Sequence, residues 1–224
     1  MNIFRVLFLL FFGATACFAT HIDSLQNAYA NQKNDSLKVQ TGFELAEEIY
    51  GTNPERAKEI FLNNIELSKK TNYIFGLAES YGWLGYLVEH NGNYKQAIHY
   101  YYQAIAGYKK LNRLNDIANI YNNISSIYGA EGKRELSLQY AIKALKLFET
   151  LKEYQGISHS CANIGKIYLD SRNFTKADRY LKESVQASLL SKIDLTIAWA
   201  YHNYGGFLFY KNERVVHPHT LHLD

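Results

Sequence analysis

The chain has 224 residues, of which 47% are hydrophobic and 15% aromatic, with 14 glycines and only 2 prolines. This composition supplies enough apolar material for a folded core and excludes a disordered or loop-rich chain. The formal net charge of +3 is spread along the chain without a basic run. Because nucleic-acid backbones bind clustered Lys and Arg, the sequence argues against a nucleic-acid partner.

The first 19 residues, MNIFRVLFLLFFGATACFA, have the pattern of a secretory signal peptide. One early charge, Arg5, precedes an apolar run from Val6 to Phe12, and small residues follow as far as Ala19. The apolar stretch is shorter than the roughly 20 residues that a membrane span needs. We therefore expect cleavage after Ala19 and a periplasmic or secreted location.

Two alternatives stay open for this leader. Residues 14–17, ATAC, form a poor lipobox that would place a lipid on Cys17, although Ala14 and Phe18 depart from that motif. The leader could also remain uncleaved as an anchor. Either alternative gives a membrane-anchored protein, and no later segment is long and apolar enough to span a membrane.

The mature chain keeps a single cysteine, Cys161, and a net charge of +2 (24 Lys and Arg less Arg5, against 21 Asp and Glu). One thiol cannot form an internal disulfide, so the fold must rest on packing even in an oxidising compartment. Cys161 falls on an apolar helical position, which predicts a small buried side chain.

Residues 20–36 are expected to form a linker with a short helix. The segment HIDSLQNAYANQ, residues 21–32, places Ile22, Leu25 and Tyr29 on one side of an amphipathic helix. We expect this helix to cover the first repeat.

From residue 37 to 214 the sequence repeats itself with a period of 40. Several columns share this register: Ala57, Ala97, Ser137 and Ala177; Tyr81, Tyr121, Cys161 and Tyr201; Leu84, Ile124, Ile164 and Tyr204; Gly85, Ser125, Gly165 and Gly205. Agreement among independent columns indicates a true repeat. Apolar residues at helical spacing on both sides of the turn NGN (91–93) predict two helices in each repeat.

Small residues are expected to set the distance between the two helices. Gly85 and Ala97 are predicted to face each other, because small side chains allow helix axes to approach to about 8–10 Å. A leucine at either position would overpack this contact at a cost of about 1–3 kcal/mol.

This pattern resembles the tetratricopeptide repeat. The family's residues are matched by Tyr81, Leu84, Gly85, Val88, Ala97, Tyr101 and Ala104, and again by Ile164, Gly165, Tyr168, Phe174, Ala177 and Leu181. The resemblance covers residues 37–214 and implies an all-α, right-handed superhelical solenoid of antiparallel helix pairs with a concave groove. Ser125, Ser137 and Arg172 depart from the pattern.

The period also departs from the family, whose usual repeat has about 34 residues. The six additional residues amount to about 1.7 helical turns, so we expect longer helices rather than a loose insertion. About four helix pairs and one unpaired helix should result.

The last repeat reads as a complete first helix, LTIAWAYHNYGGFLFYKNER (195–214), without a second. Tyr201, Tyr204, Phe207 and Leu208 would then lack a partner, so we expect either a truncated form of a longer protein or a helix that dimerises. Residues 215–224 are expected to be an irregular tail. Its His217, His219 and His222 are interpreted as unstructured rather than metal-binding, and no metal or cofactor is expected.

An asparagine column is the main candidate for binding. Asn123, Asn163 and Asn203 stand one full period apart, and an amide offers both a donor and an acceptor to a peptide backbone. The resemblance implies that this face of the first helices binds extended peptides in the concave groove. The alternative is that these amides bond across neighbouring helices and stabilise the superhelix.

Other residues are expected to share this groove. Trp83 occupies the asparagine column in the earlier repeat and should stack or fill a pocket, Tyr86 and Lys166 share a second column, and His202 flanks it. The carboxylate clamp of the family is not reproduced, because Lys166 is the only cation expected in the groove.

No catalytic constellation or phosphate loop stands out, so we expect no enzyme. The sequence is similar to the exported sensory region of bacterial sensor kinases and transcriptional regulators, which predicts a protein- or peptide-binding module with a sensory or scaffolding role. The alternative is a standalone envelope assembly factor, with or without a lipid. An enzyme using the C-terminal histidines and a cytosolic peptide-receptor regulator are weaker alternatives.

Overall fold

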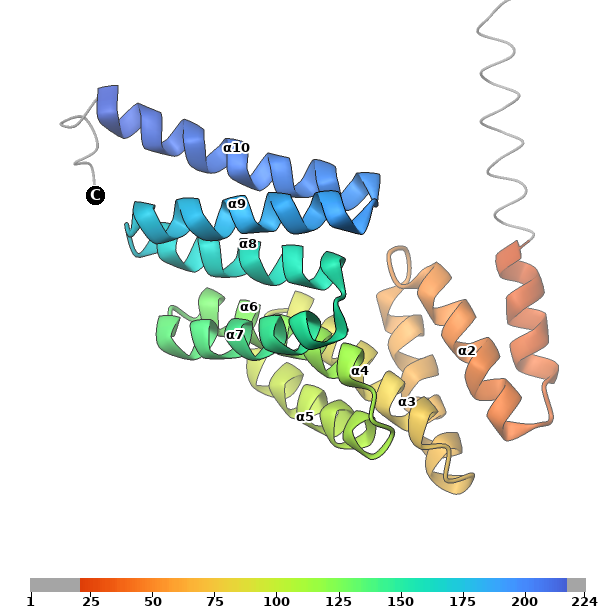
Figure 1. Cartoon of the computed structure of the whole chain (residues 1–224). Coiled ribbons are helices and arrows are strands. Elements are labelled where there is room, and N and C mark those ends of the chain that lie inside the picture. The colour runs from red at the N-terminus through yellow and green to blue at the C-terminus, as the bar shows by residue number, and fades with distance from the viewer. Residues whose placement is uncertain (1–20, 217–224) are drawn as a thin grey trace, which may run out of the picture. The chain divides into compact units, whose positions relative to one another are not determined.

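The computed structural model describes residues 21–216, with side chains as far as residue 212, as helices joined by short connections (Figure 1). Residues 21–31 form the first helix. The others are α2 (Asp35–Ile49), α3 (Pro54–Lys70), α4 (Ile74–His90), α5 (Tyr94–Lys110), α6 (Leu114–Ala130), α7 (Arg134–Leu151), α8 (Tyr154–Asp170), α9 (Phe174–Ser191) and α10 (Asp194–Val216). The chain divides into two compact parts, which we call unit 1 (Met1–Leu111) and unit 2 (Asn112–Asp224).

Several sequence predictions lie outside the described residues. These are the signal peptide over residues 1–19 with Cys17, and the histidines His217, His219 and His222. The irregular tail does not begin at residue 215 as expected, because α10 continues to Val216. No helix within residues 21–216 combines the length and hydrophobicity needed to cross a bilayer.

The helices follow one another at a fixed interval. From α3 to α10 they begin at positions 54, 74, 94, 114, 134, 154, 174 and 194, so the starting number rises by 20 each time. Each 40-residue sequence repeat therefore contains two helices whose starting positions are 20 residues apart. From α3 to α9 each helix has 17 or 18 residues, with two or three residues between consecutive helices. The prediction of longer helices rather than a loose insertion is confirmed.

Each of these connections contains one residue with positive φ, and these residues recur at the same interval as the helices. The set is Asn72, Gly92, Asn112, Gly132, Lys152, Arg172 and Lys192. A left-handed residue after a helix reverses the chain tightly, at a cost for any residue other than glycine. Arg172 adopts φ 58° in the place where Gly132 adopts φ 72°, so the missing glycine leaves the turn unchanged.

Unit 1 contains the pairs α2/α3 and α4/α5, with α3 also packed on α4. Its core includes Phe61, Ile60 and Leu84, each at most 1% exposed. The helix over residues 21–31 packs Tyr29, Ile22 and Leu25 against this core. This confirms the prediction that the segment covers the first repeat.

Gly85 makes room for an aromatic ring. A Cβ atom at this position would come within 2.6 Å of two carbons of the Tyr101 ring. Tyr101 is completely buried, and its hydroxyl donates to the Glu89 carboxylate at 2.6 Å. Gly85 therefore accommodates the large Tyr101 side chain, which lies one helical turn beyond Ala97, the residue that the sequence predicts to face Gly85.

Unit 2 repeats this contact with other side chains. A Cβ atom on Gly165 of α8 would lie 2.7 Å from Cγ of Leu181 on α9. In α6/α7 the glycine position is Ser125 and the bulky position is Ala141. There Ser125 and Ser137 each donate a hydrogen bond to the carbonyl oxygen of the other at 2.8 Å. The two predicted small columns therefore do meet in this pair, where both residues are serine.

Cys161 lies on α8 with only 2% of its surface exposed, as predicted from its place in the repeat. Burial raises the pKa of its thiol to about 12, and the nearby Glu183 and Glu149 carboxylates add to the shift. The thiol is therefore protonated at neutral pH and behaves as a small apolar side chain.

The last described helix, α10, packs against α9 and α8. The expectation that Tyr204 and Phe207 lack a partner is wrong, since Phe207 is 1% exposed in a cluster with Leu181, and the Tyr204 hydroxyl donates to Asp178 at 3.1 Å. Tyr201 and Leu208 are exposed, at 51% and 39%. Within the described residues, the second face of α10 is uncovered.

Candidate functional site

Two sequence positions that recur in every repeat lie on the exposed side of the first helix. We call this side the first-helix face. Through α4, α6, α8 and α10, one column holds Trp83, Asn123, Asn163 and Asn203, and the other holds Tyr86, Ser126, Lys166 and Gly206. These positions include most of the binding residues predicted from the sequence. Their surroundings differ sharply between the two units.

Helix α2 also contributes to the first-helix face. Its residues lie 39 positions before the corresponding residues of α4, one fewer than the 40-residue period. Its buried Leu45, Ala46 and Ile49 match the buried Leu84, Gly85 and Val88 of α4 in order and spacing. Ile49 lies five positions before the start of α3 at Pro54, whereas the matching Val88 lies six positions before the start of α5 at Tyr94. This register places Glu44 and Glu47 in the two columns.

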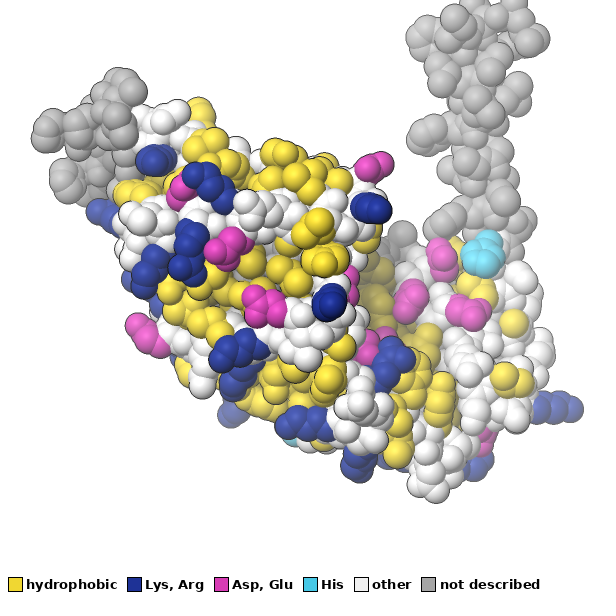
Figure 2. Space-filling model, viewed as in Figure 1, with side chains coloured by type: hydrophobic (Ala, Val, Ile, Leu, Met, Phe, Trp, Pro, Cys, Tyr) yellow, Lys and Arg dark blue, Asp and Glu magenta, His cyan; other side chains and the backbone are white. Residues whose placement is uncertain are grey.

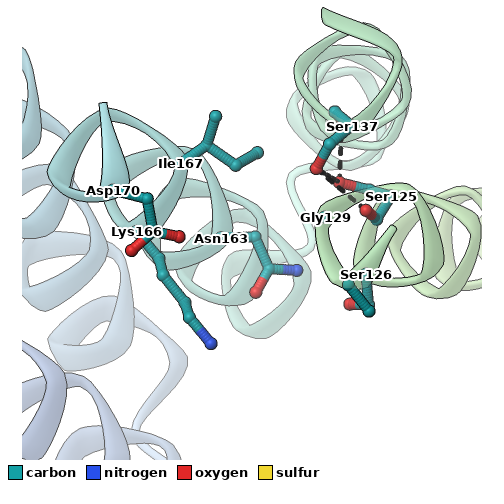
Figure 3. A pocket seen from close by; sticks show the side chains of 9 residues that line it. Ser125, Ser126, Gly129, Ser137, Asn163, Lys166, Ile167 and Asp170 are labelled. Carbon is teal, nitrogen blue, oxygen red and sulfur yellow. Dashed lines mark hydrogen bonds between the residues drawn. The ribbon is translucent and has the colours of Figure 1, made fainter. Parts of the chain in front are cut away.

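In unit 2 the first-helix face contains a cleft of about 240 Å³ between α6 and α8 (Figure 3). It is lined by Ser125, Ser126, Gly129, Ala130, Ser137, Asn163, Lys166, Ile167 and Asp170. Small residues on α6 leave this space, since Ser126 and Gly129 face the longer side chains of α8. The mutual hydrogen bonds of Ser125 and Ser137 close its inner end.

Asn163 and Lys166 bring the polar chemistry to this cleft. Figure 3 shows the Asn163 amide directed toward α6, and the Lys166 ammonium extending away from the Ser125–Ser137 pair. Asn163 is half-buried and Lys166 is exposed, and neither makes a side-chain hydrogen bond or ion pair with any described residue. The cleft therefore offers an amide donor and an amide acceptor from Asn163, the positive charge of Lys166 and the carboxylate of Asp170 to a bound molecule.

The remaining predicted residues of unit 2 do not line this cleft. Asn123 is half-buried on α6, and Asn203 on α10 donates to the carbonyl oxygen of Trp199 at 2.8 Å. His202 is exposed beside it. The asparagine column thus has one member in the cleft and one engaged within its own helix.

A different asparagine forms the bond across helices that was considered for this column. Asn122 on α6 donates to the Ser160 hydroxyl of α8 at 3.0 Å, and the hydroxyl is also 3.2 Å from the Asn122 amide oxygen. Gly82 and Ala162 stand at the equivalent positions. Sequence reasoning missed this contact, because the repeat does not preserve it.

In unit 1 the predicted Trp83 and Tyr86 belong to an aromatic cluster. The Trp83 ring lies parallel to the buried Phe61 ring, with centroids 5.6 Å apart and an angle of 6°. Tyr86 meets Trp83 edge to face at 5.7 Å, and the His90 ring lies 4.2 Å from Tyr86. Trp83 therefore stacks on the chain's own core.

Tyr50 of the α2–α3 connection completes this cluster, and the sequence did not identify it. Its ring lies 5.5 Å from Trp83 and 6.1 Å from Tyr86. Burial, followed by the proximity of Tyr50 and Glu89, raises the pKa of Tyr86. Tyr86 therefore remains protonated at physiological pH.

Comparisons of the sequence with protein families agree with this architecture. Residues 76–150 match one model of the tetratricopeptide repeat and residues 158–188 match another. No curated protein sequence matches the chain significantly. The all-α fold of consecutive antiparallel helix pairs predicted from the sequence is confirmed.

Solved structures show the same fold at low sequence identity. BtubC (BKLC) from P. vanneervenii has a TM-score of 0.68 at 17% identity, covering 86% of this chain and 80% of that one. MamA has a TM-score of 0.57 at 19% identity, covering 78% and 90%. A signal transduction ATPase with numerous domains from Pyrococcus horikoshii, described as having a tetratricopeptide repeat sensor, has a TM-score of 0.72 at 18% identity, covering 84% of this chain and 29% of that one.

Proposed function

We propose that this protein of tetratricopeptide repeats is a non-enzymatic module whose first-helix face binds an extended segment of a partner protein. Tetratricopeptide repeats generally mediate contacts between proteins, and they are typically non-catalytic. The observation that carries the proposal is the cleft between α6 and α8. It joins Asn163 and Lys166 in one space and leaves their polar groups without partners among the described residues.

The chemistry of this cleft suits a peptide better than a small metabolite. Its Asn163 amide can pair with one peptide unit as donor and acceptor, and Lys166 can meet a carbonyl or carboxylate near it. The serines and glycine of α6 leave space for backbone to lie close to the helix. An extended chain presents such backbone groups along its whole length.

We further propose that the module works at the cell envelope as the sensory or scaffolding part of a signalling protein. The leader-like pattern of residues 1–19 supports export. The description of the Pyrococcus horikoshii protein as having a tetratricopeptide repeat sensor supports signalling by analogy of fold. A standalone envelope factor anchored through Cys17 is the second candidate.

The N-terminus of the purified protein separates these two forms. Mass spectrometry that finds Thr20 as the first residue supports a cleaved, exported chain. Metabolic labelling of Cys17 with a fatty acid supports the anchored factor. A chain that retains Met1 and lacks a lipid would contradict export with cleavage.

The peptide site is tested by selecting binders from a random-peptide library displayed on phage against the full chain. Asn163→Ala should weaken the selected peptides by about 1–3 kcal/mol, roughly 5- to 150-fold in Kd, as expected for lost hydrogen bonds. The melting temperature should stay nearly unchanged. Asn203→Ala is the matched control, because that amide bonds to its own helix.

Two results would contradict the proposal. One is an equal loss of binding in Asn163→Ala and Asn203→Ala, which would show that the cleft is not the peptide-binding site. The other is intact binding with a large fall in the melting temperature of Asn163→Ala. That outcome would assign Asn163 to stabilising the fold.

A further inference from the structure

The first-helix face of unit 1 carries three aromatic rings at its surface, Tyr50, Trp83 and Tyr86, which we call the three-ring patch. Their centroids are 5.5 to 6.1 Å apart, and the rings are inclined to one another by 50°, 77° and 86°. Tyr50 is 37% exposed, and the other two are half-buried. Phe61 supports the patch from below by stacking on Trp83.

Carboxylates of α2 and α4 border this patch. Burial raises the pKa of Glu47, the Glu79, Glu44 and Glu48 carboxylates raise it further, and the nearby Trp83 indole lowers it. Neither residues 39–50 nor α4 contains Lys or Arg. Two histidines lie close by: His90 beside Tyr86, and His21 at 4.0 Å from Glu48. Figure 2 shows Asp and Glu side chains gathered over α2.

Several other tyrosines of the chain, including the buried Tyr29 and Tyr140, have a cation over the ring. Lys38 lies over the Tyr29 ring, Lys143 over Tyr121 and Tyr140, Lys176 over Tyr168, and Arg179 over Tyr180, at 4.4 to 5.8 Å from the ring centroids. Such cation–π contacts are favourable, since the negative face of the ring attracts the charge. Among the described residues, no Lys or Arg lies over the three-ring patch.

We propose that the three-ring patch and Glu47 bind a lysine or arginine side chain of a partner protein. This inference rests on the proposed function and names the chemistry of its ligand in unit 1. The cation would lie on the exposed ring faces and pair with Glu47, whose charge is repelled by its acidic neighbours. An aromatic surface with an adjacent carboxylate is the recognised environment for such cations.

The charge distribution of unit 1 favours this occupant over an acidic or an apolar one. An acidic side chain would meet Glu44, Glu47 and Glu48 at once, and like charges repel. An apolar side chain would bury Glu47 without a partner, which is costly. A positive side chain satisfies the rings and the carboxylate together.

The test uses two fluorescein-labelled probes, the peptide Gly-Ser-Lys-Gly-Lys-Gly-Ser and its counterpart with both lysines acetylated. Fluorescence anisotropy with the full chain should show binding of the lysine peptide and loss of most of it on acetylation. Glu47→Gln and Tyr50→Leu should each weaken the lysine peptide by about 2- to 5-fold, the range for a partly exposed ion pair or cation–π contact. The double variant should weaken it by roughly 10-fold.

Each variant has a control of matched exposure or charge. Glu66→Gln removes a carboxylate of α3 outside the patch, and Tyr154→Leu removes a tyrosine of α8 that is also 37% exposed. Both controls should leave the affinity unchanged. Equal binding of the two peptides, no binding of the lysine peptide, or equal losses in variants and controls would overturn the inference. The library selection with Asn163→Ala judges the proposed function separately.

Discussion

The first-helix faces of the two units occupy the same repeat columns but present opposite chemistry. In unit 1 the columns hold Trp83 and Tyr86, bordered by Glu44 and Glu47. In unit 2 they hold Asn163 and Lys166 beside the small residues of α6. The surface of unit 1 is aromatic and acidic, whereas that of unit 2 has a polar cleft lined by both Lys166 and Asp170.

The buried positions of the repeat differ from the exposed ones. Where the residue in one buried column is larger, the residue that it meets in the neighbouring helix is smaller. Gly85 meets Tyr101, Gly165 meets Leu181, and Ser125 is matched by the smaller Ala141. Core packing tolerates exchanges that conserve total volume. The repeat thus keeps its helix pairs constant while its exposed columns are free to specify ligands.

The largest expected effect concerns Cys161, which reports on the integrity of unit 2. Because burial raises the pKa of its thiol to about 12, its thiolate fraction near pH 8 should be on the order of a thousand times lower than in an unfolded chain. We expect iodoacetamide to label Cys161 only in denaturant, with the site read by peptide mass mapping. The stability contribution of the protonated thiol should be lost as the pH rises from about 9 toward 12.

Rapid labelling of Cys161 in native buffer would contradict this prediction. It would mean that α8 is not packed as described. The same labelling performed on a variant of unit 1 would show whether damage to one unit opens the other.

Gly85→Leu should produce the next largest effect. The new side chain would compete with the Tyr101 ring for the same space, so we expect a loss of about 1–3 kcal/mol in the free energy of unfolding. The midpoint of urea unfolding measures it. Gly205→Leu is the control in the same repeat column, because a Cβ atom there meets nothing within 4 Å.

The free energy of unfolding of the Gly205→Leu control should stay unchanged or rise. Leucine has a higher helix propensity than glycine by up to about 1 kcal/mol, so Gly205→Leu should be neutral or stabilising. A loss of stability at position 205 as large as that at position 85 would show that the fit of Tyr101 is not what requires the glycine.

Arg172→Gly should have the smallest effect. Arg172 adopts φ 58° in the turn between α8 and α9, a conformation that costs a non-glycine residue about 1–2 kcal/mol. Part of this cost is offset because glycine is more flexible in the unfolded chain. A rise in stability of up to about 1 kcal/mol is therefore expected by thermal unfolding, and a clear fall would mean that the Arg172 side chain stabilises the turn.

The repeat made the fold predictable because each signal occurs several times. Helix spacing, turn positions and the small column recur in register, so departures such as Ser125 and Arg172 do not hide them. The sequence did not identify the side chain that fills the space beside Gly85. Periodicity identifies which positions are small, but it does not say that the Tyr101 ring fills the space beside Gly85.

The candidate site was predictable only where the repeat continues unchanged. Asn163 and Lys166 were found because they share columns with other repeats. Glu47 was missed because α2 matches α4 at an offset of 39 residues rather than 40, and Tyr50 was missed because it lies outside the two columns. Asn122 was missed because its bond to Ser160 depends on one pair of side chains that no other repeat contains.

The two tryptophans allow the difference between the faces to be measured directly. Trp83 lies on α4 of unit 1 and Trp199 on α10 of unit 2, and the indole N–H groups of the ¹⁵N-labelled full chain give separate NMR signals. Titration with the lysine peptide should shift the Trp83 indole signal and leave the Trp199 signal in place. A shift of Trp199 alone, or of neither signal at saturation, would contradict the assignment of a cation-binding face to unit 1.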